Sequence, residues 1–190
     1  MADLDLDRRT GWPDDLRLLL QRYPREVWPG HANLGGTARF WLARHDMFRD
    51  LGGALQSATG EFREEKVALP AFRSWFAPRL RFFLSELDAH HRIEDLGYFP
   101  LLRAAEPRLA RGFAVLEGDH AALHETLARL AEAADAFLRA EDPDGLRARA
   151  DAYARVTDDL LSGLARHLAD EEDLVIPLIL DRGEDELGMG

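Results

Sequence analysis

The stretch His90-His91-Arg92-Ile93-Glu94-Asp95-Leu96-Gly97-Tyr98-Phe99-Pro100 decides how this chain folds and what it can bind. His90 and Glu94 are four residues apart, so on an α-helix they lie on one face, offset by only about 40° around the axis. An imidazole and a carboxylate placed side by side in this way can hold one metal ion or two adjacent ones. Such pairs are also common on solvated helices, so this stretch alone would not predict a site.

The same theme recurs in three other segments. His120 and His124 have the same four-residue spacing, as do His167 and Glu171, and His45 stands in an earlier segment. Candidate ligands in four separate helical segments are typical of a metal site inside a helix bundle, where facing helices project ligands inward.

Apolar residues at helical spacing predict the helices that carry these candidate ligands. We predict a first long helix from about Asn33 to Leu55, a second that begins near Pro70 or Pro78 and ends or kinks at Pro100, a third that follows Pro107 and ends near residue 141, and a fourth over about 146–180. Nothing alternates as a strand would. The predicted fold is all-α, an up-down four-helix bundle with a short N-terminal extension.

The 190 residues suit one domain, and a hydrophobic content of 46% is enough for a sizeable core. We predict that residues 1–32 form an N-terminal extension packed on the bundle and that residues 33–181 form the bundle. Residues 182–190 are polar and Gly-rich, so we expect a flexible tail.

Composition excludes several classes of protein. There is no cysteine, which excludes disulfides, zinc-thiolate fingers, iron–sulfur clusters and thiol catalysis. A net charge of −11 disfavours nucleic acid as a partner. No run of eighteen apolar residues occurs, so we expect no membrane span. The acidic N-terminus is unlike a secretory signal, so we expect a cytoplasmic protein. The sequence does not indicate an oligomeric state.

The ligand types narrow the choice of metal. A single histidine such as His45 on an apolar face is usually a buried histidine with a hydrogen-bond partner. Seven polar residues on four core-facing stripes favour a metal site over a polar network, because burying them without a metal is costly. Five imidazoles and two carboxylates suit iron, manganese or zinc better than copper(I) or calcium. Two six-coordinate ions that share the carboxylates and a solvent oxygen would use all seven and leave one position open.

The pattern resembles the hemerythrin-like domain, also called the HHE cation-binding domain, over roughly residues 45–180. The resemblance rests on the first-helix His45, on His90 with Glu94, on His120 with His124, on His167 followed by an acid, and on the flanking stretches Tyr98-Phe99-Pro100-Leu101 and Val175-Ile176-Pro177-Leu178. It implies an up-down four-helix bundle around a non-haem di-iron centre. It also implies that Glu94 and the fourth-helix acid bridge the two irons.

Two residues compete for the role of the fourth-helix acid. Oxygen-carrying hemerythrins place it five residues after the histidine, where this chain has Glu172, whereas many bacterial relatives use a four-residue spacing, which here gives Glu171. On a straight helix Glu171 lies about 40° from His167 and Glu172 about 140° away. We therefore predict Glu171 as the bridging ligand, with Glu172 as the alternative. We expect His91 to be exposed beside the site. His31 could be an extra ligand or a lid residue, but we expect an ordinary loop histidine.

Members of the resembled family carry O2, sense O2 or iron, react with nitric oxide or decompose peroxide, and the motif does not choose between binding and enzymatic turnover. The leading hypothesis is a di-iron protein that binds or reacts with a small oxidant: O2, hydrogen peroxide or nitric oxide. The alternatives are an iron- or oxygen-sensing or stress-response protein without turnover, a zinc or manganese site without redox function, and a di-metal oxygenase with an organic substrate. The last would need a pocket, which Trp41, Phe48, Phe83 and Tyr98 could line.

Overall fold

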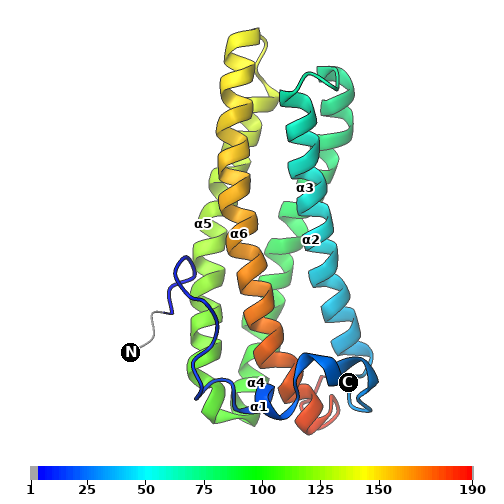
Figure 1. Cartoon of the computed structure of the whole chain (residues 1–190), viewed down its shortest axis with the longest axis vertical. Coiled ribbons are helices and arrows are strands. Elements are labelled where there is room, and N and C mark those ends of the chain that lie inside the picture. Colours follow the sequence, from blue (N-terminus) through cyan, green and yellow to red (C-terminus); the bar gives the residue numbers. More distant parts are fainter. Residues whose placement is uncertain (1–3, 190) are drawn as a thin grey trace. The chain divides into compact units, whose positions relative to one another are not determined.

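The computed structural model describes residues 4–189 (Figure 1). Its elements, in chain order, are α1 (Leu18–Arg22), the 3-10 helix η1 (Arg25–Gly30), α2 (Gly36–Arg63), α3 (Leu69–Ile93), the π-helix η2 (Glu94–Tyr98), α4 (Phe99–Ala105), the 3-10 helix η3 (Pro107–Leu109), α5 (Ala110–Leu138) and α6 (Pro143–Arg182). No strand occurs between residues 4 and 189, and the predicted all-α class is confirmed. None of the helices in this range has both the length and the apolar character needed to cross a lipid bilayer. The ends of the predicted extension and tail, residues 1–3 and 190, lie outside the described residues.

The first long helix is longer than predicted. α2 continues through Gly52 to Arg63, beyond the end predicted near Leu55. A glycine inside a helix costs roughly 0.5–1 kcal/mol relative to alanine. At Gly52, however, an added Cβ would lie 2.5 Å from Leu161 Cδ2, so glycine permits close packing there. Phe62 lies after the predicted end of this helix, and its ring packs against two phenylalanine rings, so the last turn of α2 contributes to the core.

The chain forms two compact units. Unit 1 comprises residues 1–46, 90–121 and 165–190, and unit 2 comprises residues 47–89 and 122–164. Both units contain parts of α2, α3, α5 and α6, whereas α1 and α4 belong to unit 1.

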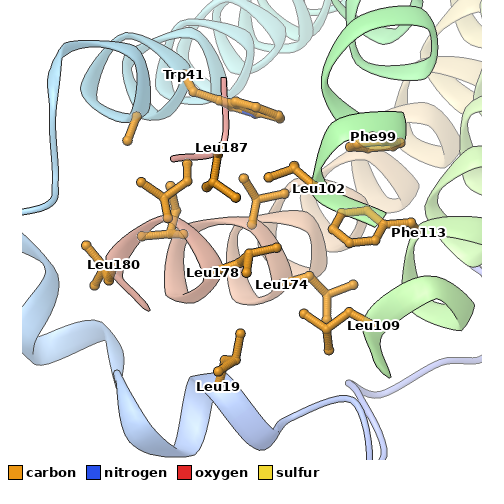
Figure 2. Close-up of a cluster of buried hydrophobic side chains, with 14 of the residues drawn as sticks. Leu19, Trp41, Phe99, Leu102, Leu109, Phe113, Leu174, Leu178, Leu180 and Leu187 are labelled. Carbon is orange, nitrogen blue, oxygen red and sulfur yellow. The ribbon is translucent and has the colours of Figure 1, made fainter. Parts of the chain in front are cut away.

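Unit 1 has an apolar core to which the N-terminal residues contribute. In Figure 2, Leu174 and Leu178 of α6 lie between Leu19 of α1 and Leu102 of α4. Trp12, which precedes α1, belongs to the same cluster and is 6% exposed. The N-terminal residues are therefore part of the core of this unit.

The C-terminal residues also join the core of unit 1. Leu187 and Met189 are buried in the apolar cluster. Glu184 Oε1 accepts a hydrogen bond of 2.7 Å from the backbone N–H of Ala38 in the first turn of α2. A carboxylate at this place satisfies a backbone donor that the helix itself leaves unpaired. The described part of the predicted flexible tail is thus packed, because its few apolar residues reach the core and its acid caps a helix.

α3 changes form just before Pro100, where the sequence predicted an end or a kink. Glu94–Tyr98 make a π-helical turn, in which the backbone N–H of Phe99 donates to Glu94 O, five residues earlier. Pro100 then stands in the first turn of α4, where its missing N–H is tolerated. Such π-turns occur frequently at functional sites, and this one begins at a predicted metal ligand.

Unit 2 has an aromatic core. Neighbouring rings in this core have centroids 4.6–6.4 Å apart and meet in stacked, tilted and edge-on arrangements. The rings belong to Phe62, Phe72, Phe76, Phe137 and Tyr153. Side chains of this size bury large apolar areas and dominate the energetics of a core.

Candidate metal centre

Seven side chains of unit 1 form two clusters that could each hold a metal ion. In each cluster, one potential ligand atom from every residue lies within 4.8 Å of those from the others. We call them the three-histidine cluster, which is His91, His120 and His167, and the two-histidine cluster, which is His45, His90, Glu94 and Glu171. All seven side chains are at most 9% exposed.

Several helices of unit 1 deliver these side chains. α2 supplies His45, the last turn of α3 supplies His90 and His91, the π-turn η2 begins with Glu94, α5 supplies His120, and α6 supplies His167 and Glu171. On α6 the four-residue spacing places both side chains on one face. The periodic stripes that bury apolar residues elsewhere on these helices therefore bury ligands here.

Two imidazoles in each cluster face each other through Nε2. His120 Nε2 and His167 Nε2 are 3.1 Å apart, and His45 Nε2 and His90 Nε2 are 3.2 Å apart. Two nitrogens that bind one metal ion at about 2.1 Å and at roughly a right angle lie about 3 Å from each other. The observed separations therefore suit histidines that share an ion.

Glu94 and Glu171 each reach both clusters. Glu94 Oε1 lies 3.0 Å from His90 Nε2, and its Oε2 lies 3.5 Å from His120 Nε2. Glu171 Oε2 lies 3.6 Å from His45 Nε2 and 3.4 Å from His167 Nε2.

These two carboxylates are buried without ordinary hydrogen bonds. Within the described residues, none of the four oxygens of Glu94 and Glu171 accepts a hydrogen bond of normal geometry. A buried carboxylate without such partners is costly. Cations at the two clusters would satisfy these oxygens, so the residues present fit a metal-binding site.

The other ring nitrogen of three histidines contacts a carboxylate. A carboxylate at Nδ1 holds the proton there and leaves the Nε2 lone pair facing the cluster, which is the form that binds metal. The three contacts are His45 Nδ1 to Glu172 Oε1 at 3.0 Å, His120 Nδ1 to Asp95 Oδ1 at 2.7 Å, and His167 Nδ1 to Asp119 Oδ2 at 3.3 Å.

Burial and neighbouring charged groups shift the pKa values of the buried histidines and carboxyl groups in opposite directions. Burial lowers the pKa of His90 to about 3. Burial alone would also lower the pKa of His167, but the carboxylates of Asp119 and Glu171 raise it to about 9. Burial and the neighbouring Glu171 raise the pKa of Glu94, whereas the surrounding imidazoles outweigh burial and lower the pKa of Glu171.

The structure brings together most of the predicted ligands but not His124. His45, His90, Glu94, His120, His167 and Glu171 lie in the clusters. His124 belongs to unit 2, its side chain is 37% exposed, and its Nδ1 lies 3.6 Å from Asp88 Oδ1. One turn of α5 separates His124 from His120, a rise of about 6 Å along the axis. A shared helix face therefore did not guarantee a shared position in the cluster.

His91 takes the third place in the three-histidine cluster. The expectation that His91 is exposed is wrong, because the side chain is completely buried. Its ring stacks on that of His120 with centroids 4.1 Å apart and meets His167 edge-on at 5.4 Å. The signal that could have revealed it is the second pair at four-residue spacing, His91 with Asp95, which runs beside the first.

The remaining candidates lie around the clusters. Glu172, the alternative bridging acid, lies on the Nδ1 side of His45 and pairs with Arg25 at 2.9 Å. His31 stays in the loop before α2, where its Nδ1 accepts a hydrogen bond of 3.2 Å from the backbone N–H of Asn33.

Comparison with known proteins agrees with this geometry. Residues 37–179 match the family model described as the hemerythrin HHE cation-binding domain. No curated protein and no solved structure matches the chain significantly.

Proposed function

Because the chain belongs to the hemerythrin HHE cation-binding family, we propose that its two clusters hold a pair of iron ions and that it binds or reacts with a small oxidant. The oxidants considered are O2, hydrogen peroxide and nitric oxide. The observation that carries this proposal is the placement of Glu94 and Glu171, each of which reaches a histidine of both clusters. A structural polar network would not leave these oxygens without hydrogen bonds.

The two clusters differ by one imidazole. Three histidines surround one position and two surround the other, while Glu94 and Glu171 each lie near a histidine of both clusters. The two-histidine cluster therefore offers fewer protein ligands, and a small molecule would bind there. Bound iron would supply the electrons for reduction of an oxidant.

Trp41 supplies a hydrogen-bond donor at the two-histidine cluster. Its Nε1–H donates to His45 Nε2 over 2.9 Å, and its ring packs against Tyr98 at 4.9 Å. Once the His45 lone pair binds a cation, this buried donor needs another acceptor. An oxygen or nitrogen atom of a bound oxidant would serve. His90, at 9%, is the most exposed of the seven candidate ligands and marks the side of entry.

An organic substrate suits the site less well. Two of the aromatic side chains considered for a pocket, Phe48 and Phe83, belong to unit 2, where their rings pack edge-on at 6.1 Å. A cavity of about 520 Å³ is also in unit 2, lined by residues within 62–68 and 143–150, and it includes none of the candidate ligands. The near-complete burial of the ligands favours a molecule of two to four atoms.

Metal analysis combined with optical spectroscopy tests the proposal. Protein produced with ample iron should contain about two iron ions per chain, as expected for a carboxylate-bridged pair in a helix bundle. The oxidised protein should show ligand-to-metal charge-transfer bands. The reduced protein should change its spectrum within seconds of exposure to O2 or nitric oxide, and the oxidised protein should respond to hydrogen peroxide.

Two results would count against the proposal in different ways. One tightly held zinc ion without iron uptake would contradict the di-iron assignment and leave the zinc or manganese alternative. A reduced, fully loaded protein that is inert to all three oxidants would leave the pair of ions in place but remove the redox function.

A further inference from the structure

Two arginines of the N-terminal segment, residues 4–35, contact carboxylates that in turn contact candidate metal ligands. Arg9 is only 1% exposed. Its guanidinium donates to Asp119 from Nη1 and Nη2, over 3.2 and 2.6 Å, and to Asp170 Oδ2 from Nε over 2.7 Å. The guanidinium carbon lies 4.9 Å from the centre of the Trp12 ring. A buried arginine with this set of partners has one defined position.

Asp119 connects Arg9 to the three-histidine cluster. The same oxygen that accepts from Arg9 Nη2, Asp119 Oδ2, lies 3.3 Å from His167 Nδ1. One carboxylate oxygen is therefore shared by a guanidinium and by the imidazole of a candidate ligand.

Arg25 makes an equivalent connection to the two-histidine cluster. Its Nη1 donates to Glu172 Oε2 over 2.9 Å, and Glu172 Oε1 lies 3.0 Å from His45 Nδ1. Arg25 also donates to Asp173 Oδ1 over 2.8 Å, and its guanidinium lies 4.8 Å from the centre of the Trp28 ring. Each cluster thus has one chain of contacts that runs from arginine through a carboxylate to a histidine.

Attachment of the N-terminal segment to the helices is the ordinary role for such ion pairs. The segment has other means of attachment, because its tryptophans and leucines pack in the apolar core and Arg22 pairs with Asp181 at 2.8 Å near the surface. Burying a charged pair often stabilises less than burying apolar side chains of similar volume. Attachment alone therefore does not explain why Arg9 is buried. Its contact with Asp119, the carboxylate at Nδ1 of His167, does explain it.

We propose that the N-terminal segment forms an outer layer of the metal centre, in which Arg9 and Arg25 act as positioning residues. Each guanidinium holds a carboxylate in place at a histidine Nδ1 and offsets part of its negative charge. The histidine then remains a neutral Nε2 ligand and gains little imidazolate character. This arrangement disfavours the oxidised, more highly charged state of a bound iron ion and so raises its reduction potential.

This inference rests on the proposed metal centre, but it concerns residues beyond the family match. Both arginines precede residues 37–179, the part of the chain that matches the family model. The outer layer is therefore a property of this chain's own N-terminal segment.

Paired substitutions separate the two effects of each arginine. Arg9→Gln and Arg25→Gln remove the charge, whereas Arg9→Lys and Arg25→Lys keep the charge but lose the fork of donors. Arg22→Gln is the matched control, because Arg22 lies in the same segment and pairs with Asp181, which contacts Tyr23 and no candidate ligand in the described contacts. Cobalt(II) affinity, measured by competition with a chelator, and the reduction potential of the iron-loaded protein are the readouts.

The glutamine variants should bind cobalt(II) about tenfold more weakly, at the lower end of the range for outer-shell partners, and should have lower reduction potentials. The lysine variants should lose affinity but keep a potential closer to that of the wild type. Arg22→Gln should match the wild type in both measurements. A role in attachment alone would change the unfolding temperature without changing the potential.

Each possible outcome decides the question. If the wild type binds metal and all the arginine variants match it in affinity and potential, the inference is wrong. A wild type that takes up neither cobalt nor iron would reject the metal centre itself, which is a different failure. If Arg9→Gln does not fold, Arg25→Gln decides, since the side chain of Arg25 is 44% exposed and tolerates replacement more readily.

Discussion

The two units use parts of the same four long helices but fill their interiors in opposite ways. Unit 2 closes its interior with the rings of Phe62, Phe72, Phe76, Phe137 and Tyr153. Its buried hydroxyl groups at Thr59 and Thr157 donate to the backbone of their own helices. Unit 1 buries five imidazoles and two carboxylates on these helices and on the π-turn η2. Parts of the same long helices therefore bury apolar rings in one unit and candidate metal ligands in the other.

The two units also differ in the interactions that hold their buried side chains in place. The aromatic core of unit 2 needs only shape and apolar area. In unit 1, carboxylates at Nδ1 orient three of the histidines, and arginines in turn hold two of those carboxylates. This layered arrangement is costly without a metal, because the buried charges must be desolvated. We therefore expect unit 2 to stabilise the fold by burial, and unit 1 to gain stability when it binds metal.

Of the predicted changes, the largest should follow from removal of a carboxylate that reaches both clusters. In Glu171→Gln we expect loss of both ions, because the lost oxygen charge serves both clusters. The metal-free protein should be about as stable as the metal-free wild type, because a buried charge has also been removed. Metal analysis and thermal unfolding with and without iron measure both effects.

Glu172→Gln is the matched control for this substitution. Glu172 contacts the Nδ1 of His45, so its loss should weaken metal binding about tenfold rather than abolish it. Equal iron contents in Glu171→Gln and the wild type would show that Glu171 is not the bridging ligand.

A large-to-small substitution in the aromatic core of unit 2 should lower stability and leave metal binding unchanged. Phe137 is fully buried among other rings, and replacement of such a phenylalanine by alanine costs about 3–5 kcal/mol. In a protein of this size, that loss lowers the unfolding temperature by about 6–20 °C. The iron content of the folded Phe137→Ala protein should stay at the wild-type level. A fall in iron content without a fall in unfolding temperature would contradict the division of roles between the units.

The sequence predicted the helices and most of the candidate site because both depend on the same short-range period. Six of the seven proposed ligands could be found by following apolar stripes until a histidine or an acid interrupted them. The structure differs from the prediction at His124 because periodicity gives the angle of a side chain around the helix axis. It does not give the position along the axis at which the neighbouring helices contribute their candidate ligands. At the position of His120 and His167, the third histidine is His91 of α3.

The supporting layer could not be predicted in this way. Arg9 and Asp119 are 110 residues apart, and nothing local to either residue indicates their contact. Asp119 is one of many acids in this chain, and only the folded arrangement shows that it lies at His167 Nδ1. The packing of Leu187 and Met189 was missed for the same reason, because a short apolar pair in a polar segment gives no periodic signal.

The last prediction compares His91, which lies in the three-histidine cluster, with His124, which does not. His91→Ala removes one of three imidazoles from its cluster, and we expect metal binding there to weaken about 100-fold, which corresponds to about 2.7 kcal/mol. His124→Ala should leave metal content and the optical spectrum unchanged, because His124 is 37% exposed and lies beside Asp88. Alanine is the best helix former, so both helices should persist in the two variants. Iron titrations that monitor the charge-transfer bands compare the two proteins directly. If His124→Ala loses metal and His91→Ala does not, the third imidazole comes from α5, as the sequence pattern suggested, and the cluster geometry described for His91 does not represent the metal-bound protein.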